Sequence, residues 1–136
     1  QQATYDLKAS AWNIEGGFHD TACFLAQQAA EKAAKSLIYY HGMRREAILT
    51  HSVVELLNSA SVKDARFQSL QEEARQLDLH YVPSRYPNGL PSGFPHRFYS
   101  RETADRAYAA AKHIVKGIRA YYVERGEKQI LSEEDQ

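Results

Sequence analysis

The spacing of the apolar residues limits what this chain can fold into more than any other feature. Over most of the 136 residues, apolar side chains recur every three or four positions, which is the period of an amphipathic helix. No sustained run alternates apolar and polar residues, as a half-buried strand does. The clearest stripe, between Ser100 and Gly126, consists of Ala104, Ala107, Ala111, Ile114, Ile118 and Tyr121. The pattern therefore predicts an all-α protein.

Residues that favour helix ends divide the chain into four to five predicted helices. These helices lie within residues 3–14, 18–40, 52–57, 61–81 and 100–126. Ser52 with Glu55 forms a capping-box pattern at the start of the third helix, and Ser61 with Asp64 marks the start of the fourth. Gly42 stands where a helix commonly ends in a left-handed residue. The short connections predict an antiparallel up-and-down bundle.

Residues 83–100 interrupt the helical pattern. All four prolines of the chain lie there, and proline at this density excludes a continuous helix. The segment also carries many aromatic and basic residues, which a simple linker does not need. We therefore expect an ordered loop across the bundle, of a length that is often functional. Residues 127–136 are expected to form a flexible acidic tail, and residues 1–136 together to form one domain.

The charge balance and the single cysteine narrow the possible functions. Seventeen basic and seventeen acidic residues leave no net charge, so an anion site must be a local cluster. Cys23 has no partner for an internal disulfide, and no secretory signal is visible, which favours a cytoplasmic protein. No stretch approaches the roughly 18 consecutive apolar residues that a membrane span requires.

The sequence predicts neither a metal site nor a bound cofactor. The six histidines are scattered, and none pairs with a helical carboxylate at the spacing of a zinc site. The doublet Gly16-Gly17 is too short for a phosphate-binding loop and is better explained as a break between helices.

The run from Gln27 to Lys35 carries a polar stripe on the second predicted helix. The stripe consists of Gln28, Glu31, Lys32 and Lys35, which are neighbours because residues three and four apart share a helix face. One interpretation is a solvated face with Gln28–Lys32 and Glu31–Lys35 pairs. The other is a polar seam between helices, whose amide, carboxylate and ammonium groups converge on a ligand.

Arg44, Arg45 and His51 have the spacing Arg-x6-His or Arg-x5-His. An arginine can hold a phosphate with its fork of donors, and a histidine can transfer protons near neutral pH. Together they could cleave RNA without a metal, by attack of a 2′-hydroxyl on the adjacent phosphorus. The alternative is that residues 50–52 simply cap a helix.

Arg85 and Tyr86 form a further candidate pair at the start of the proline-rich segment. They could stack on a base and grip a phosphate. Equally, Tyr86 could pack on the bundle while Arg85 satisfies the carbonyls at a helix end.

Together these motifs resemble the HEPN family (higher eukaryotes and prokaryotes nucleotide-binding). The matching features, in family order, are Leu7 and Ala11, the run from Ala22 to Lys35, Gly42, Thr50-His51-Ser52, Leu56-Leu57 and Arg85-Tyr86-Pro87. Residues 95–100 are similar to the HEPN domain at the end of the ataxia protein sacsin. The resemblance spans nearly the whole chain.

The resemblance implies an antiparallel bundle that pairs into a symmetric homodimer and binds nucleotides. Stand-alone prokaryotic members are often encoded beside a small nucleotidyltransferase and can act with it as toxin and antitoxin. The enzymatic branch cleaves RNA with an Arg-x4–6-His motif, commonly with an asparagine or aspartate after the arginine. Here Arg44 is followed by Arg45, and Arg45 by Glu46, so the chain departs from that pattern.

Three functional hypotheses follow, and the sequence leaves them open. The first is a nucleotide-binding module, for ATP or GTP, that partners a nucleotidyltransferase. Its site would consist of Gln28, Glu31, Lys32, Lys35, His51, Arg85 and Tyr86. The second is a metal-independent endoribonuclease, with RNA as substrate and His51, Arg44 and Arg45 as catalytic residues. The third is a dimerisation scaffold without a ligand.

The tyrosines give a separate physical reason to expect a dimer. Tyr39, Tyr40, Tyr121 and Tyr122 lie near predicted helix ends in a chain with nine tyrosines and five phenylalanines. We expect them to leave aromatic surface that a second copy could cover.

Overall fold

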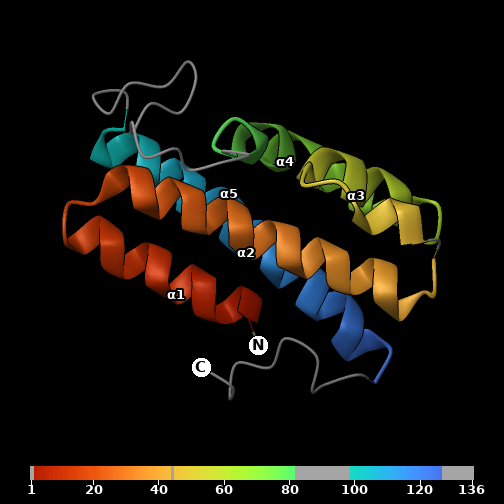
Figure 1. Ribbon diagram of the computed structural model, residues 1–136. Helices are drawn as coiled ribbons and strands as arrows, with labels where there is room; N and C mark the ends of the chain where they lie inside the picture. Colours follow the sequence, from red (N-terminus) through yellow and green to blue (C-terminus); the bar gives the residue numbers. More distant parts are fainter. Residues whose placement is uncertain (1, 44, 82–98, 127–136) are drawn as a thin grey trace.

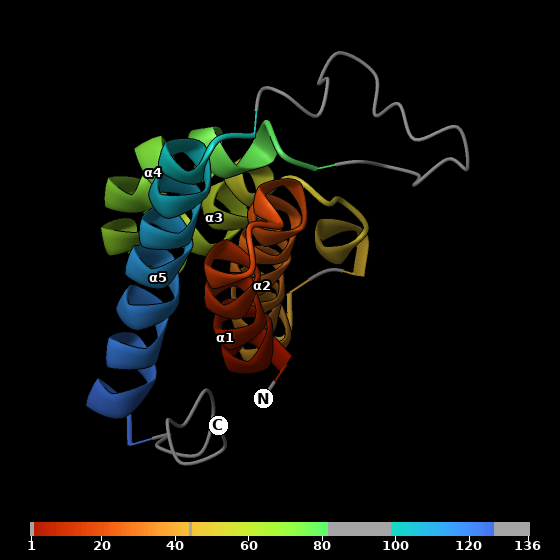
Figure 2. The same cartoon turned by 90° about the vertical axis from the view of Figure 1, so that its left-hand side faces the viewer.

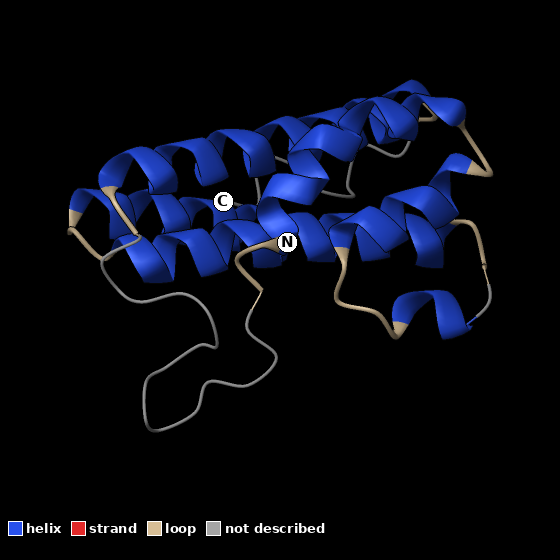
Figure 3. Cartoon of the chain, turned by 90° about the horizontal axis from the view of Figure 1, so that it is seen from above, coloured by secondary structure: helices blue, strands red, loops and turns tan. Residues whose placement is uncertain are grey.

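The computed structural model describes residues 2–43, 45–81 and 99–126. Its α-helices are α1 (Gln2–Glu15), α2 (His19–Tyr40), α3 (Val53–Ser61), α4 (Gln71–Asp78) and α5 (Arg101–Glu124). Two 3-10 helices are η1 (Arg45–Ile48) and η2 (Ala65–Leu70). The described residues contain no strand, which confirms the predicted all-α bundle (Figure 3). Most of the proline-rich segment and the whole acidic tail lie outside them.

The helices pack around α2, which contacts α1, α3, α4 and α5. α1 and α2 form an antiparallel hairpin, and α3 and α4 form a second one that covers α2 and α5 (Figures 1 and 2). α5 runs in the same direction as α2, because Tyr121 of α5 lies beside His41 at the end of α2. None of the described helices is both long and apolar enough to cross a membrane.

Small side chains allow α2 to be enclosed in this way. Its alanines are completely buried: Ala22, Ala26, Ala29, Ala30, Ala33 and Ala34. Alanine lets neighbouring backbones approach closely, and the larger core side chains come mainly from the surrounding helices. A larger residue at these positions would have no space without displacing a neighbouring helix.

Glycine and capping residues mark the start or end of two helices where the sequence predicts these boundaries. Gly42 adopts φ 62°, a left-handed conformation that favours glycine, directly after α2. In this conformation the Met43 amide donates to the Ile38 carbonyl at 3.1 Å, which satisfies the end of the helix. At the start of α5, Ser100 Oγ accepts from the Thr103 amide at 3.1 Å. The predicted boundaries of these two helices are confirmed.

The fourth helix differs from the prediction. Ser61 is the last residue of α3, and Asp64 caps the 3-10 helix η2, so that α4 begins only at residue 71. The 3-10 turn places residues three apart on the same side, which buries both Phe67 and Leu70. The apolar spacing in this segment is thus compatible with either helix type, and we assigned the wrong one.

The expectation about exposed tyrosines is also wrong for two of the four. Tyr121 and Tyr122 are 2% and 0% exposed and belong to the core. The Tyr122 hydroxyl forms a 2.7 Å hydrogen bond with Ser36 Oγ, and burial raises the pKa of Tyr122 to about 12. Their position near the end of a predicted helix suggests exposure. In the structure α5 ends beside the end of α2, and the packing of the two helices buries both side chains. Tyr39, in contrast, is 70% exposed.

Glycine 117 offers a test of the helical packing. It lies inside α5, and a Cβ at this position would meet Leu70 Cδ1 at 3.5 Å, an ordinary contact. Gly117→Ala should therefore raise the free energy of unfolding by about 0.5–1 kcal/mol, measured by urea denaturation. Gly42→Ala is the matched control, because its positive φ should make the same change destabilising. Destabilisation by Gly117→Ala would contradict the packing of α5 on η2.

Candidate functional site

Polar side chains gather where α2 faces the start of α3. We call this group the Glu31 cluster; it consists of Gln27, Gln28, Glu31, Lys35 and His51. The glutamate and both glutamines lie on α2 with Lys35, and the histidine lies in the connection that leads into α3. Gln27 is fully buried and Glu31 is 4% exposed, although each side chain is polar.

Donors surround the buried Glu31 carboxylate. Lys35 Nζ lies 2.9 Å and His51 Nδ1 3.0 Å from Oε2. Gln27 Nε2 and Gln28 Nε2 lie 3.2 and 3.3 Å from Oε1. Both oxygens therefore have two partners, which is the condition under which a carboxylate can be buried at moderate cost.

The pKa of Glu31 reflects two opposing effects. Burial is the largest single influence and by itself raises the pKa. The hydrogen bonds from Lys35, His51 and Gln27, with the positive charge of Lys35, together outweigh burial and leave the pKa below its usual range. Glu31 is therefore ionised at neutral pH and acts as a fixed negative charge.

His51 is oriented by this charge. An ionised carboxylate only accepts hydrogen bonds, so Nδ1 must carry the proton that it shares with Glu31. The ring stacks on Tyr81, with centroids 4.8 Å apart and planes at 13°, and the side chain remains 51% exposed. Nε2 is thereby left as the ring nitrogen available to a ligand, either as donor to an anion or as a proton-transfer group.

Two further contacts fix the connection that carries His51. Gln27 Nε2 donates to the His51 carbonyl at 3.1 Å. Asp78, at the end of α4, accepts from Ser52 Oγ at 2.6 Å and from the first amide of α3 (Val53) at 2.7 Å. Asp78 thus caps a helix that lies 25 residues earlier in the chain.

Sequence reasoning missed three residues of this arrangement. Gln27 lies in the run that carries the polar stripe but not in the predicted site, and Asp78 and Tyr81 belong to no predicted site. Gln27 had a detectable signal, since it precedes Glu31 by four residues on the same helix. Asp78 and Tyr81 had none, because their partners at residues 51–53 lie far from them along the chain.

The other predicted site residues are not part of the Glu31 cluster within the described residues. Lys32 turns toward α1, where its Nζ lies 2.6 Å from the nearly buried carboxylate of Asp6. Arg45 lies on η1 and lines a separate hollow with Ile38, Tyr39, Met43, Ile48 and Leu49. Arg44, Arg85 and Tyr86 lie outside the described residues.

Substitution of Glu31 should reveal the energetic role of the cluster. Glu31→Gln should lower the free energy of unfolding at pH 7 by about 1–3 kcal/mol, because several donors lose a charged acceptor. Since folding lowers this pKa, the stabilisation is present above the ordinary glutamate pKa of about 4.3 and is lost as the pH falls through the lower folded value. Denaturant titrations of both proteins across this pH range should show the difference shrinking in acid.

Glu72→Gln is the control for this experiment. Glu72 also pairs with a cation, Arg75, but both side chains are exposed, at 67% and 60%. An exposed pair of this kind contributes less than about 1 kcal/mol, so this variant should change little at any pH. Equal effects of the two substitutions would show that burial of Glu31 does not matter.

Comparison with known proteins places the chain in a family. The HEPN domain matches residues 1–121 of the chain. An archaeal HEPN homologue has a TM-score of 0.70 and 32% identity, covering 88% of this chain and 91% of its own. An HEPN domain protein from Thermotoga maritima has a TM-score of 0.68 and 32% identity, covering 89% and 93%. A Thermus thermophilus protein has a TM-score of 0.68 and 32% identity, covering 88% and 91%.

No curated protein sequence gave a significant match. The family match covers most of the chain, and the similar structures cover nearly nine tenths of it at 32% identity. The described helices also have the arrangement of these structures. The resemblance seen in the motifs is thus confirmed, and the chain belongs to the HEPN domain family.

Proposed function

We propose that this protein is a nucleotide-binding HEPN module that binds ATP or GTP at the Glu31 cluster. The observation that carries the proposal is the buried, ionised Glu31, which holds a lysine and a half-exposed histidine side by side. A structural ion pair needs only one cation. Two cationic or titratable donors on one carboxylate, at the edge of the solvent, are suited to an anionic ligand.

Each member of the cluster has a role in this proposal. Lys35 is 23% exposed and retains N–H donors that Glu31 does not use, so it can contact a phosphate. His51 offers Nε2 to the same phosphate, and its stack on Tyr81 keeps the ring in place. Gln28, which is partly exposed, can bond to a ribose or a base. The proposal also includes three residues that could complete the site: Lys32, Arg85 and Tyr86.

Calorimetric titration of ATP and GTP tests this site. The wild-type protein should bind at least one of them, and Lys35→Ala and His51→Ala should each weaken binding about tenfold, as expected for loss of a hydrogen bond to a charged group. Lys63→Ala and His113→Ala are matched controls, since both residues are exposed and lie elsewhere. Absence of binding to the wild type, or equal losses in the controls, would exclude a nucleotide site at the Glu31 cluster.

We also propose that the protein forms a homodimer and partners a small nucleotidyltransferase in a toxin–antitoxin system. The hollow of about 460 Å³ beside η1 supports the dimer, because Tyr39 and Leu49 on its edge are 70% and 67% exposed. An apolar edge of this kind is suited to a protein partner. The buried thiol of Cys23, whose pKa burial raises to about 12, is compatible with the proposed cytoplasmic location.

One observation favours a second function, a metal-independent endoribonuclease. The Glu31–His51 pair resembles the carboxylate–histidine arrangement that prepares an imidazole for proton transfer. In this case His51 would act as general acid or base, and Arg44 or Arg45 would stabilise the charge on the phosphorane. Within the described residues no hydrogen bond joins Arg45 to His51, and Arg45 lines a separate hollow, so the arginine would have to come from elsewhere, such as a second copy.

An RNA cleavage assay in the presence of EDTA distinguishes this function. A ribonuclease of this type should cut unstructured RNA with EDTA present, and His51→Ala should slow cleavage about a hundredfold or more. His113→Ala again serves as the control. If the wild type leaves RNA intact while still binding ATP or GTP, the module is not a ribonuclease.

A further inference from the structure

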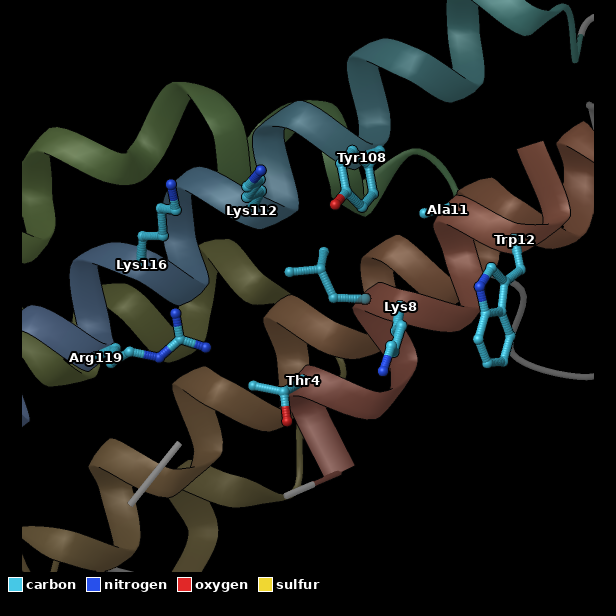
Figure 4. Close-up of a pocket in the computed structure, with 9 residues that line it drawn as sticks. Thr4, Lys8, Ala11, Trp12, Tyr108, Lys112, Lys116 and Arg119 are labelled. Carbon is cyan, nitrogen blue, oxygen red and sulfur yellow. The ribbon is translucent and has the colours of Figure 1, made fainter. Parts of the chain in front are cut away.

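A basic groove runs between α1 and α5, away from the Glu31 cluster. Its volume is about 470 Å³, and it is lined by Thr4, Leu7, Lys8, Ala11, Trp12, Tyr108, Lys112, Lys116 and Arg119. Figure 4 shows Tyr108 and Arg119 extending from α5 toward α1, and Lys8 and Trp12 pointing to the same side of α1. None of these residues belongs to the Glu31 cluster.

The charge of the groove has one sign. Four of its nine lining residues are lysine or arginine, and none is acidic. The whole chain carries no net charge, so this excess is local rather than a general property of the surface. Cations that face one cleft concentrate anions there and attract polyanions in particular.

Aromatic rings alternate with these cations. Lys8 Nζ lies 5.9 Å from the centre of the Trp12 ring, and Lys112 Nζ lies 5.8 Å from the centre of the Tyr108 ring. Trp12 is 62% exposed, whereas an indole is normally highly buried. The groove thus combines flat stacking surfaces with positive charge, which simple phosphate binding does not require.

From these features we infer that the α1–α5 groove binds a single-stranded nucleic acid. Stacking of bases on exposed aromatic rings, with lysine and arginine along the backbone, is how such strands are bound without sequence preference. A duplex is unsuited, because its bases are already stacked and cannot reach the rings. The cations from Lys112 to Arg119 extend over about 10 Å of helix, which suits successive phosphates of a strand better than those of one nucleotide.

Trp12 provides a direct measurement, because it is the only tryptophan in the chain. A single-stranded RNA of eight nucleotides should quench its fluorescence as a base stacks on the indole, and a DNA strand of the same sequence identifies which of the two is preferred. Quenching by either strand supports the inference. A duplex of the same length should leave the signal nearly unchanged.

Variants then assign the binding to the groove. By fluorescence anisotropy with a labelled strand, Lys112→Ala/Lys116→Ala should weaken binding at least tenfold and reduce the slope of log affinity against log salt by about two. Trp12→Ala should weaken binding by about tenfold, and Trp12→Phe should restore most of the loss, since stacking needs only a flat ring. These side chains are exposed, so the variants should fold, and Lys63→Ala is the control.

Three results would overturn the inference. The first is an unchanged affinity in the Lys112/Lys116 double variant. The second is strand binding without any change in Trp12 fluorescence, and the third is duplex binding as tight as strand binding. The test is independent of the proposed nucleotide site: Lys35→Ala should leave strand binding intact, and the groove variants should leave ATP and GTP binding intact.

Discussion

The burial of one ionised carboxylate, that of Glu31, constrains the local structure around it. A buried charge is strongly unfavourable unless donors surround it, and here both oxygens have two partners. Three of the donors, on Gln27, Gln28 and Lys35, come from α2 itself, but His51 comes from a different part of the chain. The connection before α3 must therefore lie against α2, and Gln27 strengthens this by holding the His51 carbonyl.

This constraint extends through the second helical hairpin. Because the connection is fixed on α2, the start of α3 is fixed too, and its free amides need an acceptor. Asp78 supplies that acceptor from the end of α4, and Tyr81 covers the face of the His51 ring. α4 in turn packs on α5. A local requirement of one side chain is thus transmitted to the relative positions of four helices.

Sequence patterns predicted the helices well because helix formation is mainly local. The apolar period, the Ser52 cap and the left-handed Gly42 all act within a few residues, and each has its expected role. The Glu31–Lys35 pair was foreseen for the same reason. Partners from different helices, such as Lys32 with Asp6 or Val53 with Asp78, depend on packing and have no local signal. Phe67 and Leu70 show a further limit, since a spacing of three fits both helix types.

The enclosure of α2 has a consequence for how the molecule moves. α2 contacts every other α-helix, so its amides can exchange with solvent only when most of the fold opens. The connection that carries His51, in contrast, is held by a small number of partly buried side-chain hydrogen bonds. Glu31 therefore lies in the part of the backbone whose amide hydrogens exchange most slowly, and His51 lies in a part whose amide hydrogens exchange faster. Any rearrangement on ligand binding should therefore be confined to the connection that carries His51, while the Glu31 carboxylate stays in place.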